Sequence, residues 1–154
     1  MLYNKYQTRS TTLKIVIASD HGGFELKEKI YSYLLNKGYD VQNFGTDSNE
    51  SCDYPIFARK VCNAILNDDF NKGILICGTG IGMSIMANRH KGIRAACLSD
   101  KYSAEMTRKH NDSNVLCFGA RVINEDTAKE IVDIWLETKY EAGRHQKRVE
   151  MLDK

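Results

Sequence analysis

The sequence predicts a three-layer α/β/α sandwich whose middle layer is a five-stranded parallel sheet. Two observations support this fold class. Short apolar runs alternate with longer amphipathic stretches five times along the chain, as expected for strands covered by helices on both faces. The chain has 154 residues and a single proline, which fits one domain with a full apolar core and no extended linker.

Five short runs have the composition of strands. They occupy residues 14–18, 40–44, 73–77, 94–98 and 115–119. The first and third runs are almost continuously apolar and rich in β-branched residues, which is typical of strands buried on both faces. We therefore expect the third run to be central and the second to be weaker. The polar, aperiodic residues 1–13 are expected to form a loosely ordered extension, which leaves residues 14–154 as one domain.

The stretches between these runs carry helix signals. Residues 24–37 place apolar side chains on one helical face, and Gly38 supplies a common C-terminal stop. Pro55 suits the first turn of the second helix, and a short third helix follows Gly82. The predicted buried stripe of the second helix is Ala58, Val61, Cys62, Ile65 and Leu66.

Caps mark the last two helices. Ser99 or Asp100 is expected to cap a helix that reaches His110, and Asn124 caps the final long helix. The predicted core face of that final helix is Ala128, Ile131, Val132 and Trp135. A charged, basic tail that includes residues 143–148 ends the chain. Successive β–α units of this kind are typical of Rossmann-like and flavodoxin-like sheets, whose ligands bind beyond the carboxyl ends of the strands.

Composition disfavours several classes of protein. The chain carries 22 basic and 20 acidic residues, so it makes no general case for binding nucleic acid or a membrane. No apolar run approaches the roughly 20 residues of a membrane helix, and the N-terminus lacks the apolar segment of an export signal. Five cysteines without a CxxC motif disfavour a zinc ribbon and fit free thiols in a reducing cytoplasm.

The glycine loop Gly78-Thr-Gly-Ile-Gly82 is the strongest local signal. Three glycines between a strand and a helix let backbone N–H groups approach an anion at the positive end of the helix. The spacing is GxGxG, which departs from the GxGxxG dinucleotide fingerprint, and no Gly-Lys-Ser/Thr follows as in a Walker loop. We favour an anion-binding loop, with a merely tight turn as the alternative.

Cys77 directly precedes this loop, where the start of a helix favours a thiolate. The sixth residue after it is Met83, so the Cys-x5-Arg loop of cysteine phosphatases is absent. We favour a functional thiol at Cys77 over a buried apolar one. The other cysteines are interpreted as small buried apolar side chains (Cys62, Cys97, Cys117) or as a neutral loop residue (Cys52).

Asp20 and His21 follow the first strand, at the same edge of the sheet as Cys77. A neighbouring carboxylate and imidazole suit the orientation of a sugar hydroxyl and the binding of a phosphate. For Asp20 the alternative is the cap of the helix that begins at Phe24.

The second half of the chain adds further candidates. His110 ends a helix, where an imidazole is often only a cation stabilised by the helix dipole. Arg144 and Arg148 are four residues apart, so they share a helical face and could clamp a phosphate or simply form a solvated basic surface. The remaining histidines, His90 and His145, lie in charged stretches that we expect to be exposed.

Several motifs occur together in a fixed order between about residue 14 and residue 150. They are Ser19-Asp-His-Gly-Gly23, Asp53-Tyr-Pro55, Gly73-Ile-Leu-Ile-Cys-Gly-Thr-Gly-Ile-Gly82, Ala87-Asn88, Gly92-Ile-Arg94, His110-Asn-Asp112, Phe118-Gly-Ala-Arg121 and Tyr140-Glu-Ala-Gly-Arg-His-Gln-x-Arg148. In order and spacing this set resembles type B ribose-5-phosphate isomerase. The wider family also includes galactose-6-phosphate and allose-6-phosphate isomerases.

The resemblance implies interconversion of D-ribose 5-phosphate and D-ribulose 5-phosphate through a cis-enediolate, in the non-oxidative pentose phosphate pathway, with no metal and no cofactor. Cys77 would move the proton between C2 and C1, and His110 would assist ring opening with help from Thr79 and Asp20. The loop residues Gly78, Gly80, Ile81 and Gly82 would stabilise the enediolate oxygen. The other implied substrate-binding residues are His21, Arg121, Arg144 and Arg148 for the phosphate, and Tyr54 and Asn111 for the sugar. Met83 occupies the position where some members carry a glutamate, so the chain resembles the cysteine version.

Two alternatives stay open: an isomerase of the same family that acts on a six-carbon sugar phosphate, and a nucleotide- or flavin-binding module. The resemblance also implies a homodimer, or a dimer of dimers, with shared active sites. Geometry predicts the same sharing. A helix of ten residues carries His110 roughly 15 Å back from the carboxyl edge of the sheet, and the final helix does the same for Arg144 and Arg148. His110, Arg144 and Arg148 are therefore expected near the edge of the sheet opposite Cys77, from which they cannot easily reach Cys77 of their own chain.

Overall fold

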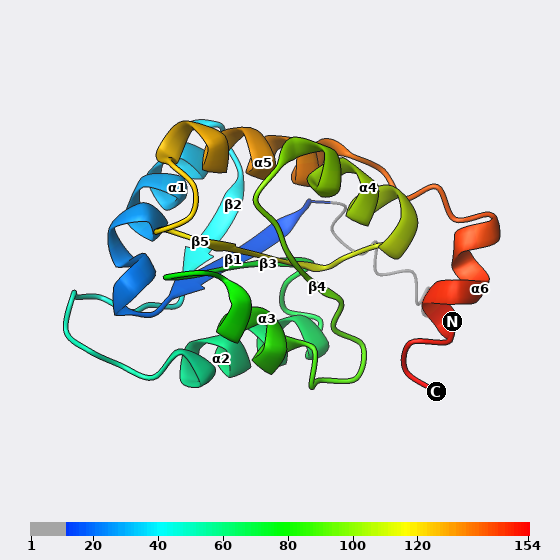
Figure 1. The fold of residues 1–154 in the computed structure, drawn as a ribbon, viewed down its shortest axis with the longest axis horizontal. Coiled ribbons are helices and arrows are strands. Elements are labelled where there is room, and N and C mark those ends of the chain that lie inside the picture. Colours follow the sequence, from blue (N-terminus) through cyan, green and yellow to red (C-terminus); the bar gives the residue numbers. More distant parts are fainter. Residues whose placement is uncertain (1–11) are drawn as a thin grey trace, which may run out of the picture.

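The computed structural model describes residues 12–154 and has the predicted α/β/α architecture (Figure 1). The strands are β1 (Lys14–Ser19), β2 (Asp40–Asn43), β3 (Lys72–Cys77), β4 (Ala95–Cys97) and β5 (Val115–Gly119). They pair in parallel in the order β2-β1-β3-β5-β4, which confirms that the third apolar run is central. The last two strands are exchanged relative to the flavodoxin order. Apart from Thr12 and Leu13, the predicted N-terminal extension lies outside the described residues.

Helices cover both faces of this sheet. They are α1 (Phe24–Asn36), which follows the short 3₁₀ helix η1 (His21–Gly23), then α2 (Tyr54–Leu66), α3 (Ile81–Ala87), α4 (Lys101–Asn111), α5 (Glu125–Glu137) and α6 (Arg144–Glu150). Helices α1, α4 and α5 pack on one face, and α2 and α3 on the other (Figure 1). The charged tail thus contains a helix, α6. Within residues 12–154, no helix combines the length and the apolar character that crossing a membrane requires.

The strand alternation divides the core into two layers. In β3, Ile74 and Ile76 pack toward α1 and α5, whereas Leu75 and Cys77 pack toward α2 and α3. The predicted core face of α5 is confirmed, because all four of its residues are fully buried. Its Trp135 also donates from Nε1 to Ser113 Oγ at 2.9 Å, so the indole N–H is satisfied inside the core.

The predicted helix ends are also confirmed. Asp100 caps α4 by accepting from the Ser103 N–H at 2.7 Å, and Asn124 caps α5 by accepting from the Thr127 N–H at 2.9 Å. Gly38 follows α1 with a φ of +86°, the left-handed conformation that glycine adopts without strain.

Two burial predictions are wrong. Leu66 is 44% exposed, because each residue advances 100° around a helix and the last residue of α2 falls outside the stripe that ends at Ile65. Cys97 is exposed, because β4 is a three-residue edge strand that pairs with β5 alone among the described residues. The apolar run 94–98 is longer than the strand that it forms.

The burial pattern of α2 generates a stability prediction for two adjacent residues. Ile65→Ala is expected to lower the free energy of unfolding by about 2–4 kcal/mol, because it leaves a cavity in the core. Leu66→Ala is the matched control and should cost no more than about 1 kcal/mol, since that side chain is half-exposed. Chemical denaturation of both variants measures the difference. Equal losses would contradict the observed helix register.

Candidate active site

Most of the predicted site residues meet at the carboxyl edge of the sheet. β1 ends next to Asp20 and His21, β3 ends at Cys77, and Arg121 follows β5. Because β1, β3 and β5 are adjacent and parallel, their carboxyl ends lie side by side. Tyr54 joins them from the first turn of α2.

Cys77 lies below the glycine loop with only 6% of its surface exposed. The Gly80 N–H donates to its Sγ at 3.0 Å, and so directs the positive end of a backbone dipole at the sulfur. The neighbouring Thr79 hydroxyl accepts from the Ile81 N–H at 3.2 Å. One loop N–H, that of Gly80, is therefore directed at the thiol just before α3 begins.

Each glycine of the loop lies close to a neighbour that a side chain would have to displace, and at Gly80 that neighbour is backbone. A Cβ at Gly80 would lie 2.8 Å from backbone atoms of Phe118, and the residue has a φ of +80°. A Cβ at Gly82 would lie 2.8 Å from Cζ of Tyr54. At Gly78 the nearest atom would be Nη1 of Arg121, at 3.3 Å. The spacing of the three glycines therefore follows from packing against β5, α2 and Arg121.

Asp20 and His21 are held by backbone groups. Asp20 is 8% exposed, and its Oδ1 accepts from the Gly23 N–H at 3.2 Å. The capping role considered for Asp20 is thus present, in the 3₁₀ helix rather than at Phe24. Nδ1 of His21 lies 3.1 Å from the Cys52 N–H and accepts from it, which leaves Nε2 to carry the proton of the neutral ring. That N–H is the one available to donate to an anion.

A polar hollow of about 380 Å³ opens beside His21. Its lining includes Arg121, Lys29 and the start of α5. Lys29 pairs with Glu125 at 3.2 Å, whereas the guanidinium of Arg121 lies next to the backbone of Gly78. The carboxyl edge therefore combines a buried thiol, a glycine loop and a polar hollow that Arg121 and Lys29 line together with Glu25 and Glu125.

The remaining predicted residues lie together at the other end of the molecule. His110 and Asn111 end α4, and Arg144 and Arg148 belong to α6. All four line a cavity of about 360 Å³. Figure 1 shows α6 at the end of the fold opposite the loop that leads from β3 into α3. One chain thus holds two separate groups of predicted site residues.

His145 is buried, which contradicts the expectation that its charged stretch is exposed. Its ring stacks on that of His110, with a centroid distance of 4.3 Å and an interplanar angle of 18°. Burial lowers the pKa of His145, and the neighbouring imidazole of His110 lowers it further. His145 therefore favours the neutral form and supports His110 by packing. His90 is half-buried rather than exposed and contacts the Met86 and Ala87 carbonyls at the end of α3.

Sequence reasoning assigned no role to His145 or to Cys52. His145 precedes Arg148 by three residues, so the helical spacing placed the two on neighbouring positions and could have signalled a shared face. No sequence signal indicates that the Cys52 N–H contacts His21, because 31 positions separate the two residues.

The other cysteines lie outside the glycine loop and the residue that precedes it. Burial raises the pKa of Cys62 to about 12 and that of Cys117 well above its ordinary value, so both are packing residues as predicted. Cys97 is exposed. Within residues 12–154, no three His, Cys, Asp or Glu side chains are grouped as metal ligands. The expectation of a reaction without metal or cofactor stays a prediction.

Comparison with known proteins identifies close relatives. The family model described as ribose/galactose isomerase matches residues 15–152. The chain is 50% identical over 139 residues to ribose-5-phosphate isomerase B of Escherichia coli, covering 90% of this chain and 93% of that protein. It is 43% identical over 141 residues to D-erythrulose-4-phosphate isomerase of Pectobacterium atrosepticum, covering 91% and 93%. The structure of ribose-5-phosphate isomerase B from Clostridium thermocellum superposes with a TM-score of 0.90 at 49% identity, covering 92% of this chain and 95% of that one.

The glycine packing generates a prediction about loop geometry. Gly80→Ala is expected to destabilise the fold by at least about 2 kcal/mol, because it combines a left-handed backbone with a clash against backbone atoms. Gly82→Ala is the control and should change stability by no more than about 1 kcal/mol, because the half-exposed Tyr54 ring can turn aside and alanine favours the helix. Denaturant unfolding measures both. A fully stable Gly80→Ala variant would contradict the described loop.

Proposed function

The chain belongs to the ribose/galactose isomerase family, and we propose that it interconverts D-ribose 5-phosphate and D-ribulose 5-phosphate. The observation that carries this proposal is the thiol of Cys77, which precedes the glycine loop and accepts a hydrogen bond from the Gly80 N–H. The relatives named ribose-5-phosphate isomerase B support it, at 50% identity over nearly the whole chain.

The proposed reaction is an aldose–ketose isomerisation through a cis-enediolate. The thiolate of Cys77 removes the proton from C2 of the open-chain aldose, the electron pair forms the C1=C2 bond, and the negative charge moves to O1. A proton then passes from O2–H to O1, which leaves the charge on O2. The same sulfur returns its proton to C1, and C2 becomes the ketone carbonyl. The backbone N–H groups of residues 78–82 stabilise the oxygen that carries negative charge in between.

Cys77 is the base in this proposal because position 83 offers none. Met83 is fully buried and has no titratable group, so a carboxylate is missing from the start of α3. Thr79, in the glycine loop, and Asp20, directly after β1, assist ring opening together with His110. Tyr54 stands over Gly82, where it contacts the sugar, and Ile81 is 55% exposed at the mouth of the loop.

The phosphate-binding groups come from both ends of the fold. His21 and Arg121 lie at the carboxyl edge, whereas Arg144 and Arg148 lie with His110 and Asn111 at the far end. We therefore propose a homodimer in which the far end of one copy completes the site of the other. The five free thiols fit a reducing cytoplasm, where the pentose phosphate pathway operates.

One observation favours a second candidate for the substrate. A relative with 43% identity is named D-erythrulose-4-phosphate isomerase, so members of this family differ in the length of their sugar. The matching family model is described as ribose/galactose isomerase, so a six-carbon sugar phosphate is the alternative here. Comparing kcat/KM for ribose 5-phosphate, allose 6-phosphate and galactose 6-phosphate separates these candidates. A higher value for either hexose phosphate would overturn the proposed substrate.

Cys77→Ser is expected to lower kcat for ribose 5-phosphate by at least about 100-fold while KM changes little, because a hydroxyl of high pKa is a poor base at neutral pH. The matched control is Cys62→Ser, a buried thiol on α2 whose Sγ contacts the Ala87 carbonyl and which lies outside the proposed chemistry, and it should keep its activity. Steady-state kinetics measure both. Near-native kcat in Cys77→Ser would remove Cys77 from the proposed mechanism.

Shared sites predict complementation between two inactive variants. Cys77→Ala and His110→Ala damage opposite ends of the chain, so a mixed dimer has one doubly damaged site and one intact site. Random pairing makes about half of the dimers mixed, and roughly a quarter of all sites should regain activity after co-refolding. Each variant refolded alone is the control. No recovery in the mixture, with mixed dimers demonstrated by mass, would rule out sharing.

A further inference from the structure

The turn that ends α4 has an uncommon backbone. Asp112 adopts a left-handed conformation, with φ of 47° and ψ of 45°, although it is not glycine. The last carbonyls of a helix have no partner within the helix, so this turn needs donors from elsewhere. Its conformation matters because His110 and Asn111 directly precede it, and both belong to the proposed site.

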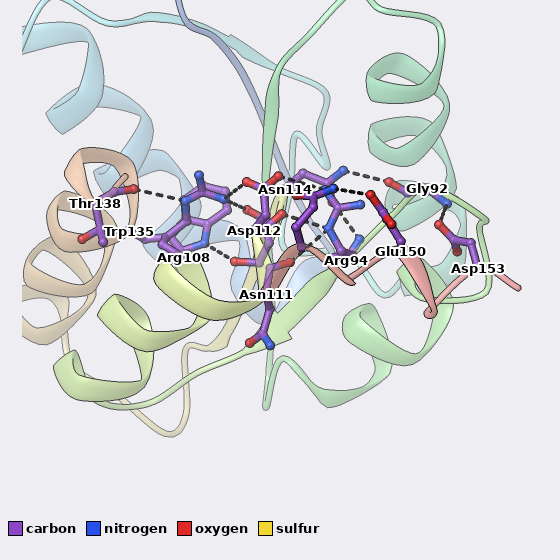
Figure 2. A network of polar contacts seen from close by, with 12 residues as sticks. Gly92, Arg94, Arg108, Asn111, Asp112, Asn114, Trp135, Thr138, Glu150 and Asp153 are labelled. Atoms are coloured by element: carbon purple, nitrogen blue, oxygen red, sulfur yellow. Dashed lines mark hydrogen bonds and ion pairs between the residues drawn. The ribbon is translucent and has the colours of Figure 1, made fainter. Parts of the chain in front are cut away.

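Two arginines supply these donors. Nε of Arg94 donates to the Asn111 and Asp112 carbonyls at 3.1 Å and 3.0 Å, and its Nη2 lies 3.5 Å from the Asp112 carboxylate. Nη1 of Arg108 donates to the same carboxylate at 3.0 Å and to the Ser113 carbonyl at 2.5 Å. We call Arg94, Arg108 and Asp112 the arginine clamp. Its two arginines hydrogen-bond both the side chain and the backbone of the turn (Figure 2).

The arginine clamp also joins separate elements. Nε of Arg108 donates to the Thr138 carbonyl at 3.4 Å, at the start of the segment that leads to α6. The Arg94 N–H donates to Asn114 Oδ1 at 2.7 Å, and the Asn114 amide donates in turn to the Gly92 carbonyl. The end of α4 is thereby fixed relative to the segment before β4 and the start of β5.

Figure 2 shows how the clamp relates to the proposed site: the Asn111 amide points away from the two guanidinium groups. Arg94 thus binds the backbone of Asn111 and leaves its side chain free. The Asn111 side chain is exposed and borders the cavity that contains Arg144 and Arg148. His110, one residue earlier, is stacked on His145 in the same cavity.

We propose that Arg94 is a positioning residue, which fixes the left-handed turn at Asp112 so that His110 and Asn111 are presented to the substrate. The inference rests on the proposed isomerase function and adds to it a residue that does not touch the reacting atoms. Arginine suits this role because its planar fork reaches two carbonyls and a carboxylate together. Lysine offers a single ammonium group at the same place.

The test compares three variants by steady-state kinetics with ribose 5-phosphate. Arg94→Met should lower kcat by about 10–100-fold, because a misplacement near 1 Å at reacting groups costs this much, while KM changes less than about threefold. Arg94→Lys keeps the charge but not the fork and should still lose about fivefold or more in kcat. The matched control is Arg59→Met, an exposed arginine on α2, which should behave as wild type.

A double-mutant comparison separates positioning from a merely structural role. In an Asn111→Ala background one of the two positioned side chains is already absent, so adding Arg94→Met should lower kcat by a factor at least about threefold smaller than in the wild-type background. A structural role would cost the full factor in both backgrounds. The full factor in both, or wild-type kcat in folded Arg94→Met, overturns the proposal.

Two further outcomes are assigned in advance. If Arg94→Met does not fold, Arg94→Lys decides: wild-type kcat in that folded variant overturns the proposal, and the stated loss supports it. If the wild-type protein itself does not isomerise ribose 5-phosphate, the proposed function fails. The positioning role of Arg94 then fails together with the proposed function. Failure of the positioning role alone gives a different result, in which the wild type is active and the Arg94 variants are equally active.

Discussion

The common direction of the strands is the constraint on which the rest of the structure depends. In a parallel sheet every strand ends at the same edge, and each following helix returns the chain to the opposite edge. Residues at or just after the ends of adjacent strands, such as Cys77 and Arg121, therefore lie close together. Residues at the ends of the returning helices, such as His110 and Arg144, gather at the other end for the same reason. The division of the predicted site into two groups is thus a property of the topology.

The fold follows from local signals that agree with one another. Continuous apolar runs predicted β1, β3 and β5, and side-chain caps predicted the starts of α4 and α5. Predictions failed where burial depended on tertiary neighbours. Cys97 is apolar enough to pack, but the exchange of β4 and β5 leaves it on an edge strand. His145 lies in a charged stretch, and only the position of α6 against the end of α4 buries it.

The sequence likewise predicted part of the candidate site. The strand-end position of Cys77 and the loop glycines could be inferred from sequence, because chain order alone places them at the carboxyl edge. The reason for the glycine spacing could not be inferred from sequence, because it depends on residues of other elements that pack against the loop. These are Phe118 behind Gly80 and the Tyr54 ring over Gly82. The contact of the Cys52 N–H with His21 is equally invisible in the sequence. Non-local contacts of this kind decide side-chain orientation, and with it which nitrogen of an imidazole can donate.

The edge of the sheet formed by β4 is relevant to the proposed dimer. Asn88 occupies part of this edge, because its amide exchanges hydrogen bonds of 2.8 Å and 2.9 Å with both backbone groups of Ala95, as a neighbouring strand would. Beyond Ala95 a hollow of about 690 Å³ runs along β4, bordered by Tyr102 and Leu152, which are 72% and 62% exposed. Edge strands and apolar side chains in contact with water favour association. A second copy on this surface would remove both from water, so burial of the β4 edge would favour the proposed dimer.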